Sequence, residues 1–168
     1  GITNEKIYDW AKEKISLSEE SSISIDDTVC EKWNTKQIDL VKRQYSGNYG
    51  GVVPGIGIIT TSYNNSAMKE SFCIDYNVFD FKIDGLKKTY HVYNQIINSI
   101  NNKDLLFNNI LFDSYYASAK ILNMINYHGK FYYTKLRKNR IIYIKRENKW
   151  EKSQLKDLIL TEEEIKCG

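Results

Sequence analysis

The spacing of hydrophobic positions along the chain alternates between strand-like and helix-like. Residues 5–15 carry apolar side chains at helical intervals, which predicts a short helix. Residues 21–26 (SSISID) alternate Ser with Ile and predict a strand that runs into acids, whereas residues 33–51 are polar and are predicted to be a loop. Residues 52–63 and 71–79 are β-rich runs whose turn-rich link is consistent with a hairpin.

The second half of the chain alternates helices with strands. Residues 86–100 and 118–127 have apolar side chains three and four apart, which predicts two amphipathic helices. Residues 108–113 (NNILFD) predict a short strand buried on both faces, and residues 130–136 and 140–145 predict two further strands. The order strand, strand, strand, helix, strand, helix, strand predicts a mixed α/β sheet whose later strands are parallel.

Composition indicates a folded protein of one domain. The chain has 168 residues, of which 42% are hydrophobic and 13% aromatic, which excludes a disordered tail. A net charge of +3 is compatible with nucleic acid without demanding it. Three cysteines form no CxxC pair and predict reduced thiols. No signal peptide or membrane span is visible, so a cytoplasmic location without membrane contact is expected.

Two acids stand out by their position relative to the predicted strands. Asp27 is expected to end the first strand, and Asp113 ends the strand NNILFD. Carboxylates at the carboxyl edge of an open α/β sheet lie where ligands bind, and a pair of them can hold a cation such as Mg²⁺. The alternative is that each Asp only caps the following turn or helix. As a pair in this order of elements, the two acids favour the metal site.

Several blocks of the sequence resemble the DDE transposases of bacterial insertion sequences. They are IDDTVCEK, VKRQYSGN, GIGII, IDYNVFD and ILFDSYYASAKILNMINYHGKFYYTKLRKNR, in the order that this family has. The resemblance covers about residues 22–168 and is strongest to the group with an insertion domain before the final Glu. It implies a ribonuclease H-like core, divided here into a helical lead-in (1–20), the core (21–140) and the start of a β-rich insertion (141–168).

The resemblance also implies a chemistry. Transposases of this type use Mg²⁺ or Mn²⁺ for strand cleavage and transfer on DNA, with transposon ends and target DNA as partners and a possible homodimer of the full-length protein. Asp27 and Asp113 match the first two metal-binding acids. Asp26 is the alternative to Asp27; the two lie on opposite faces of a strand, so only one can reach the metal. Asp27 is preferred because the family's acid directly precedes Thr.

The family's third acid, a Glu on a late helix, has no counterpart in its usual Tyr/Arg context. Residues 162–164 are all Glu but come too early, so the chain looks like a fragment truncated before the last catalytic helix and inactive alone. Gly50 and Pro54 stand where relatives tend to have His and a basic residue. The alternatives are therefore a non-catalytic DNA-binding relic of a transposase, or another ribonuclease H-like nuclease.

A basic segment, residues 135–149, is the predicted DNA-contacting region. Such a cluster suits contacts to phosphates that position DNA without reading its sequence. A solvated strand face that protects a sheet edge is the alternative. Tyr115 and Tyr116, beside Asp113, are candidate stacking platforms for bases. The predicted DNA-binding residues are Lys135, Arg137, Lys138, Arg140, Lys145 and Arg146.

Overall fold

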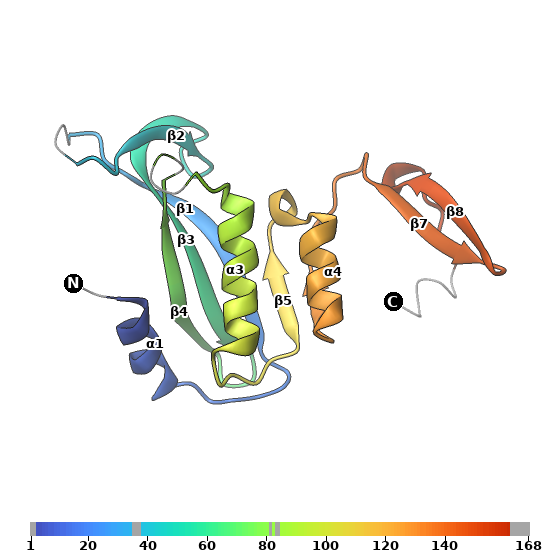
Figure 1. Ribbon diagram of the computed structural model, residues 1–168, viewed down its shortest axis with the longest axis horizontal. Helices are drawn as coiled ribbons and strands as arrows, with labels where there is room; N and C mark the ends of the chain where they lie inside the picture. Colours follow the sequence, from blue (N-terminus) through green and yellow to red (C-terminus); the bar gives the residue numbers. More distant parts are fainter. Residues whose placement is uncertain (1–2, 35–37, 81, 83–84, 162–168) are drawn as a thin grey trace. The chain divides into compact units, whose positions relative to one another are not determined.

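The structure is a computed structural model that describes residues 3–34, 38–80, 82 and 85–161 (Figure 1). The chain divides into two units, Gly1–Tyr133 and Thr134–Gly168, which are described separately. The functional boundaries predicted at residues 20 and 140 stay a prediction.

The first unit is built on a six-stranded mixed sheet. Three pairings are antiparallel (β1 with β3, β2 with β3, β3 with β4), while β1 with β5 and β5 with β6 are parallel. The predicted mixed α/β sheet is thus confirmed, and its strand order is compatible with a ribonuclease H-like fold. The strands are β1 (Ser22–Glu31), β2 (Lys42–Ser46), β3 (Gly51–Asn65), β4 (Glu70–Phe79), β5 (Asn109–Phe112) and β6 (Phe131–Tyr133).

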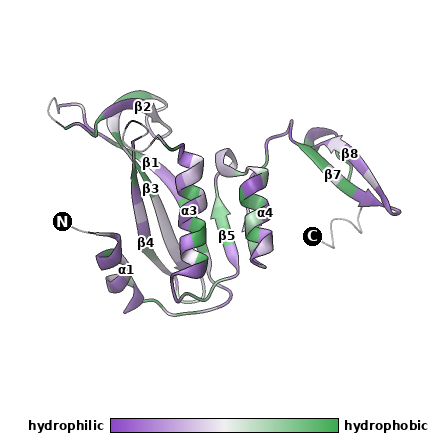
Figure 2. Cartoon of the chain, viewed as in Figure 1, coloured by the Kyte–Doolittle hydropathy of each residue, from purple (hydrophilic) through white to green (hydrophobic). Residues whose placement is uncertain are grey.

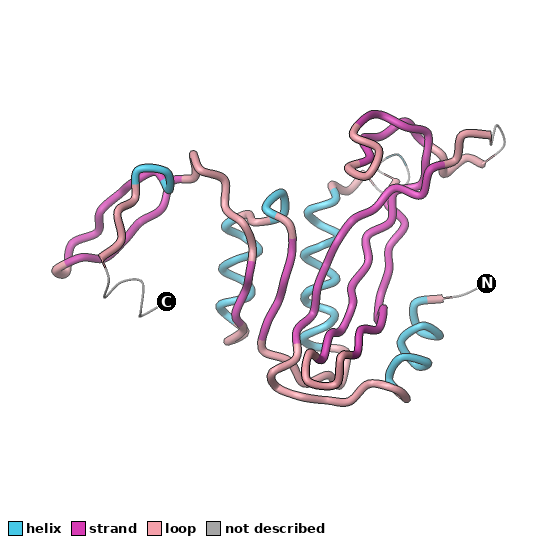
Figure 3. Tube along the Cα trace, turned by 180° about the vertical axis from the view of Figure 1, so that it is seen from behind, coloured by secondary structure: helices cyan, strands magenta, loops and turns pink. Residues whose placement is uncertain are grey.

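Two longer helices, α3 (Lys88–Asn101) and α4 (Ala119–Tyr127), lie against the same face of the sheet (Figures 1 and 3). A shorter helix, α1 (Asn4–Lys12), packs beside β4. Ser118 caps α4, since its side chain accepts a hydrogen bond from the Ile121 N–H. The helix ends just before Gly129, whose φ of +65° is the left-handed conformation expected of a glycine there.

The core lies between the sheet and the two longer helices. Buried and less buried residues alternate along the first half of β1 and along β3, so that one face of each strand is buried there. In Figure 2 most of β5 is coloured hydrophobic, as expected for a strand with neighbours on both sides, whereas α1 is mostly hydrophilic. The fully buried aliphatic residues include Ile23, Ile59, Ile96, Ile110 and Ile125.

Four sequence predictions about the strands need correction. β5 was predicted to be buried on both faces, but only one face is: Ile110 and Phe112 are buried, whereas Leu111 is 38% exposed. β1 continues to Glu31, because Thr28 to Glu31 keep the ladder with β3, so Asp27 lies within the strand instead of ending it. Residues 33–51 were predicted to be a loop, but they contain the strand β2, which pairs with the first residues of β3. The strand was not recognised because its side chains are mostly polar. β6 is only Phe131–Tyr133, shorter than the run predicted over residues 130–136.

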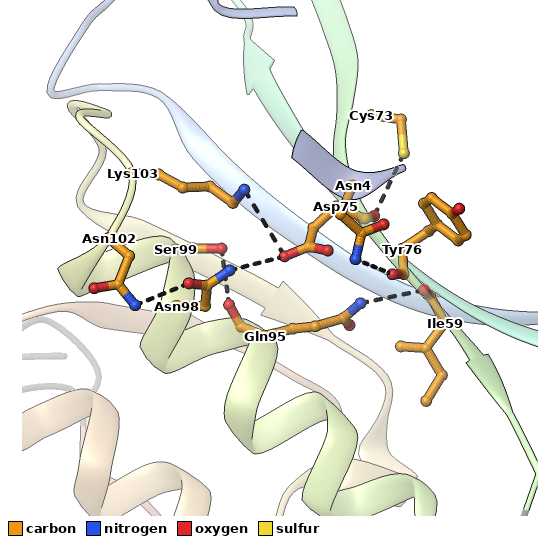
Figure 4. A network of polar contacts seen from close by, with 10 residues as sticks. All are labelled: Asn4, Ile59, Cys73, Asp75, Tyr76, Gln95, Asn98, Ser99, Asn102 and Lys103. Atoms are coloured by element: carbon orange, nitrogen blue, oxygen red, sulfur yellow. Dashed lines mark hydrogen bonds and ion pairs between the residues drawn. The ribbon is translucent and has the colours of Figure 1, made fainter. Parts of the chain in front are cut away.

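A buried polar network fastens α3 to the sheet (Figure 4). Gln95 donates to the Ile59 carbonyl at 3.2 Å, and Asn98 donates to the Asp75 carboxylate at 3.0 Å. The Lys103 ammonium lies 3.8 Å from the same carboxylate, and both side chains are buried. Burial lowers the pKa of Lys103, while Asp75 acts in the opposite direction.

An irregularity in β4 explains how Asp75 comes to be buried. The register with β3 shifts between Thr61 and Ser62, which adds one residue to β4. Ile74 and Asp75 are consecutive, yet both are buried, which strict alternation along a strand would forbid. A β-bulge re-aims a side chain in this way, and here it delivers Asp75 to α3.

The second unit is a β-hairpin of β7 (Ile141–Arg146) and β8 (Lys149–Gln154). Its turn residues, Glu147 and Asn148, have φ of 46° and 66°, the pair of positive values that a type I′ turn requires. β7 was predicted, but β8 was not, because KWEKSQ carries no apolar alternation.

Candidate active site around Asp27

A cavity of about 670 Å³ opens in the first unit where β1, β5 and the start of α3 meet. Asp27 of β1 and Asp113, directly after β5, both line it. Lys87 and Lys88 at the start of α3 line it as well, so the cavity contains carboxylates and cationic side chains. The parallel register, in which Ile25 pairs with Phe112, is what brings the two acids to one edge of the sheet.

The alternation of β1 separates Asp27 from Asp26. Ile23 and Ile25 are buried under the helices, and Asp27 continues their face of the strand. Asp26 is exposed on the other face, and its carboxylate accepts a hydrogen bond from the Asp27 N–H at 2.9 Å. Only Asp27 of the two lines the cavity together with Asp113.

Both oxygens of the Asp27 carboxylate have partners within the protein. The Lys88 ammonium lies 2.6 Å from Oδ2, and the Tyr116 hydroxyl donates to Oδ1 at 2.5 Å. The side chains of Lys88 and Asp27 are 20% and 28% exposed, so the ion pair is partly shielded from water. Partial burial strengthens such a pair relative to one on an open surface.

Tyr116 is fully buried, and its hydroxyl needs a partner. Burial raises the pKa of Tyr116 far above its usual range, and the hydrogen bond to Asp27 raises it further, since both disfavour the phenolate. Tyr116 therefore remains a proton donor to Asp27. Its burial also means that it cannot stack on a base, contrary to the possibility raised from the sequence, whereas Tyr115 is 59% exposed at the cavity.

Asp113 has a second role as a cap. Its Oδ1 accepts hydrogen bonds from the Tyr115 N–H at 2.7 Å and from the Ser114 hydroxyl at 3.4 Å, at the start of a single 3₁₀ turn, Ser114–Tyr116. This is the capping role that the sequence left open as an alternative. The cap engages Oδ1, and the residue lines the cavity at the same time.

The start of α3 is electrostatically unusual. Lys87 is the N-cap residue without a side-chain cap, Lys88 is the first helical residue, and the first turn contains no acid. Positive charge at a helix N-terminus opposes the macrodipole. Asp27, from a distant strand, supplies the compensating negative charge. Lys87 and Lys88 can be read from the sequence as the start of the predicted helix, but nothing local to them identifies Asp27 as the partner of Lys88.

The carboxylate oxygens in the cavity are ligands of the type that a hard cation prefers. Asp27 and Asp113 offer carboxylate oxygens, the ligands that Mg²⁺ and Mn²⁺ prefer. Within the described residues, no three His, Cys, Asp or Glu side chains gather into a metal cluster. Residues 162–164, the Glu run that comes too early in the chain to supply the third acid, lie outside the described residues. An ion at Asp27 Oδ2 would take the position that the Lys88 ammonium holds.

The predicted DNA-contacting residues all belong to the second unit. Lys135, Arg137, Lys138 and Lys145 are exposed, and Arg140 is half-buried. Arg146 is half-buried and pairs with Glu151 at 3.3 Å, so it is partly committed to the hairpin. Trp150 is 68% exposed and lies opposite Lys145, which places an aromatic ring beside a basic side chain.

The chain has a structural likeness to a transposase of known structure and no match at the level of sequence families. No protein-family model and no curated protein matches the sequence. The chain is similar to the piggyBac transposase in a cryo-EM structure of its synaptic complex with hairpin DNA, with 16% identity and a TM-score of 0.49. The match covers 74% of this chain and 24% of the piggyBac chain, so this chain spans about a quarter of that protein.

No helix among the described residues is both long enough and apolar enough to cross a membrane.

Proposed function

We propose that the chain is the catalytic part of a DDE-type transposase, which cleaves and transfers DNA strands during transposition of an insertion sequence. The observation that carries this proposal is the shared cavity of Asp27 and Asp113, acids from two neighbouring parallel strands. Carboxylates that line one cavity are the ligand type used in metal-dependent phosphoryl transfer. The motif resemblance of the same two acids points to DNA as the substrate.

Asp27 and Asp113 are the residues that would hold Mg²⁺ or Mn²⁺. Such ions activate the attacking oxygen and stabilise the leaving oxygen of a phosphodiester. Tyr116 fixes one oxygen of Asp27, and the 3₁₀ turn fixes one oxygen of Asp113, so each carboxylate is oriented before any ligand arrives. Lys87, exposed at the cavity, adds positive charge where a phosphate would approach.

A second candidate function is a DNA-binding relic without chemistry. The observation in its favour is that Lys88 and Tyr116 already satisfy both oxygens of Asp27. No third acid joins the pair among the described residues. For either function we expect the chain alone to give little strand cleavage, because two carboxylates retain a second ion poorly.

Iron-mediated cleavage of the protein backbone tests the metal site without requiring catalysis. Fe²⁺ bound in place of Mg²⁺, with ascorbate and peroxide, generates radicals that cut the chain beside the ion. We expect cuts near Asp27 and Asp113, suppressed by excess Mg²⁺ and lost in Asp113→Asn. Asp104→Asn, an exposed acid paired with Lys12, is the matched control and should retain the cuts. Cuts that are absent, or that persist in Asp113→Asn, would remove the metal-dependent function.

A further inference from the structure

We propose that Lys88 is a built-in competitor for the metal: its ammonium is the resident cation of Asp27, and a divalent ion binds there only by displacing it. This inference rests on the proposed function, since it concerns the same site. It assigns to Lys88 control over metal affinity, a role distinct from that of a ligand.

The contact between Lys88 and Asp27 is specific and held from several sides. Nζ lies 2.6 Å from Oδ2, and it also sits 5.5 Å from the centre of the Phe79 ring, within range of a cation–π contact. The Lys88 side chain is only 20% exposed. The ammonium is therefore localised at the carboxylate, in contrast to the exposed side chain of its neighbour Lys87.

The position of Lys88 in α3 is not explained by helix stability. Lys87 and Lys88 open the helix, where positive charge is disfavoured, and no acid in the first turn offsets them. An acidic or neutral residue at either position would suit the helix better. The ion pair with Asp27 offsets the unfavourable interaction of Lys88 with the helix dipole, and it links the start of α3 to the acid of the cavity.

A divalent ion at Asp27 Oδ2 and the Lys88 ammonium beside the same oxygen would be two cations in close contact, and they would repel each other strongly. Mg²⁺ requires close, near-octahedral oxygen ligation. The Lys88 ammonium lies 2.6 Å from Oδ2, whereas the Tyr116 hydrogen bond orients Oδ1 and adds no positive charge. A positive charge within a few ångströms weakens the binding of a proton to a carboxylate by roughly one to three powers of ten, and we expect a comparable weakening for a metal cation. Metal binding thus requires Lys88 to swing away on its flexible stem.

Direct titration of Mn²⁺, followed by its electron paramagnetic resonance signal, tests this competition. We expect Lys88→Met to bind Mn²⁺ about tenfold more tightly than wild type, or more. Lys120→Met removes the same charge from an exposed side chain of α4 that does not line the cavity, and it should change the affinity by less than about threefold. Adding Asp113→Asn to Lys88→Met should weaken binding again, which assigns the ion to the cavity.

Failure of this inference differs from failure of the proposed function. Equal Mn²⁺ affinities in wild type and Lys88→Met, both reduced by Asp113→Asn, would overturn the role of Lys88 and leave the metal site standing. Absence of Asp113-dependent binding in wild type and in Lys88→Met would overturn both.

A second measurement needs no variant and covers the case in which Lys88→Met does not fold. Reductive methylation of the wild-type protein, read by mass spectrometry, reports the reactivity of each lysine. Mg²⁺ should raise labelling of Lys88 several-fold by releasing it from Asp27, while labelling of Lys87 stays constant. Labelling of Lys88 that is unaffected by saturating Mg²⁺ would overturn the displacement.

Discussion

Replacing Tyr116 with Phe removes one hydrogen bond at the cavity with little change of shape. The hydroxyl donates to Asp27 Oδ1 at 2.5 Å from a fully buried ring. Hydrogen bonds to charged groups contribute about 1.5–3 kcal/mol. Because Asp27 is 28% exposed, water can replace the lost donor, so we expect the lower end: a loss of about 1.5 kcal/mol in the free energy of unfolding at neutral pH.

The same substitution should change how stability depends on alkaline pH. The pKa of Tyr116 is raised in the folded state, so the unfolded chain releases this proton first, near its ordinary pKa of 10.0. The stability that Tyr116 contributes is therefore complete below pH 10 and is lost as the pH rises above it. Release of this one proton by the unfolded chain lowers the free energy of unfolding by about 1.4 kcal/mol at pH 11, which is roughly one unit above the unfolded-state pKa. Wild type and Tyr116→Phe should then be nearly equal in stability.

Urea unfolding at pH 8, 10 and 11, followed by circular dichroism, measures this convergence. Tyr115→Phe is the matched control, since Tyr115 is the exposed neighbour, and its difference from wild type should stay small at every pH. A gap between wild type and Tyr116→Phe that persists unchanged to pH 11 would refute the reasoning, because it would mean that Tyr116 ionises as easily in the folded protein as in the unfolded chain.

Two further predictions concern the polar network and the basic hairpin. Lys103→Met should lower the free energy of unfolding in urea by about 3 kcal/mol, because it leaves the buried Asp75 carboxylate without its cationic partner. Adding Asp75→Leu to the same chain should restore part of the loss. A double variant as unstable as the single one would show that the charge pair is not the cause. Changing Arg137, Lys138 and Arg140 together to Ala should flatten the log–log salt dependence of DNA affinity by up to about three units. An unchanged slope, measured by fluorescence anisotropy at several salt concentrations, would retire the DNA-contacting role and favour protection of a sheet edge.

The sequence predicted the elements whose packing is encoded by local periodicity. The short apolar run NNILFD predicted the strand β5, although its expected burial on both faces is wrong, and the spacing of residues 86–100 predicted α3. The strands β2 and β8 were not predicted, because their stability comes from pairing with a neighbouring strand and their polar sequences do not show that pairing. The β-bulge at Ile74 was not predicted for a similar reason, because it depends on the register between β4 and β3.

The candidate site was only partly predictable. Asp113 follows β5 as predicted, whereas Asp27 was selected because it was predicted to end a strand, which is wrong. The structure brings both acids to one cavity, and their role as metal ligands stays a prediction. The contacts of Lys88 and Tyr116 with Asp27 join segments far apart in the chain, so no local pattern contains them. A buried tyrosine three residues after an acid, and lysines at an uncapped helix start, become informative only once the fold is known.

The parallel pairing of β1 with β5 has a consequence for the order of folding. Antiparallel β3 and β4 are joined by a short turn, whereas Ser22 finds its partner at Asn109, after α3 has intervened. Closing so long a loop costs more entropy than closing a hairpin, and it slows the pairing that depends on it. We therefore expect the antiparallel strands to assemble first and β5 to dock last. Asp27 would then sit on a formed sheet before Asp113 arrives, and the cavity would be among the last features of the molecule to appear.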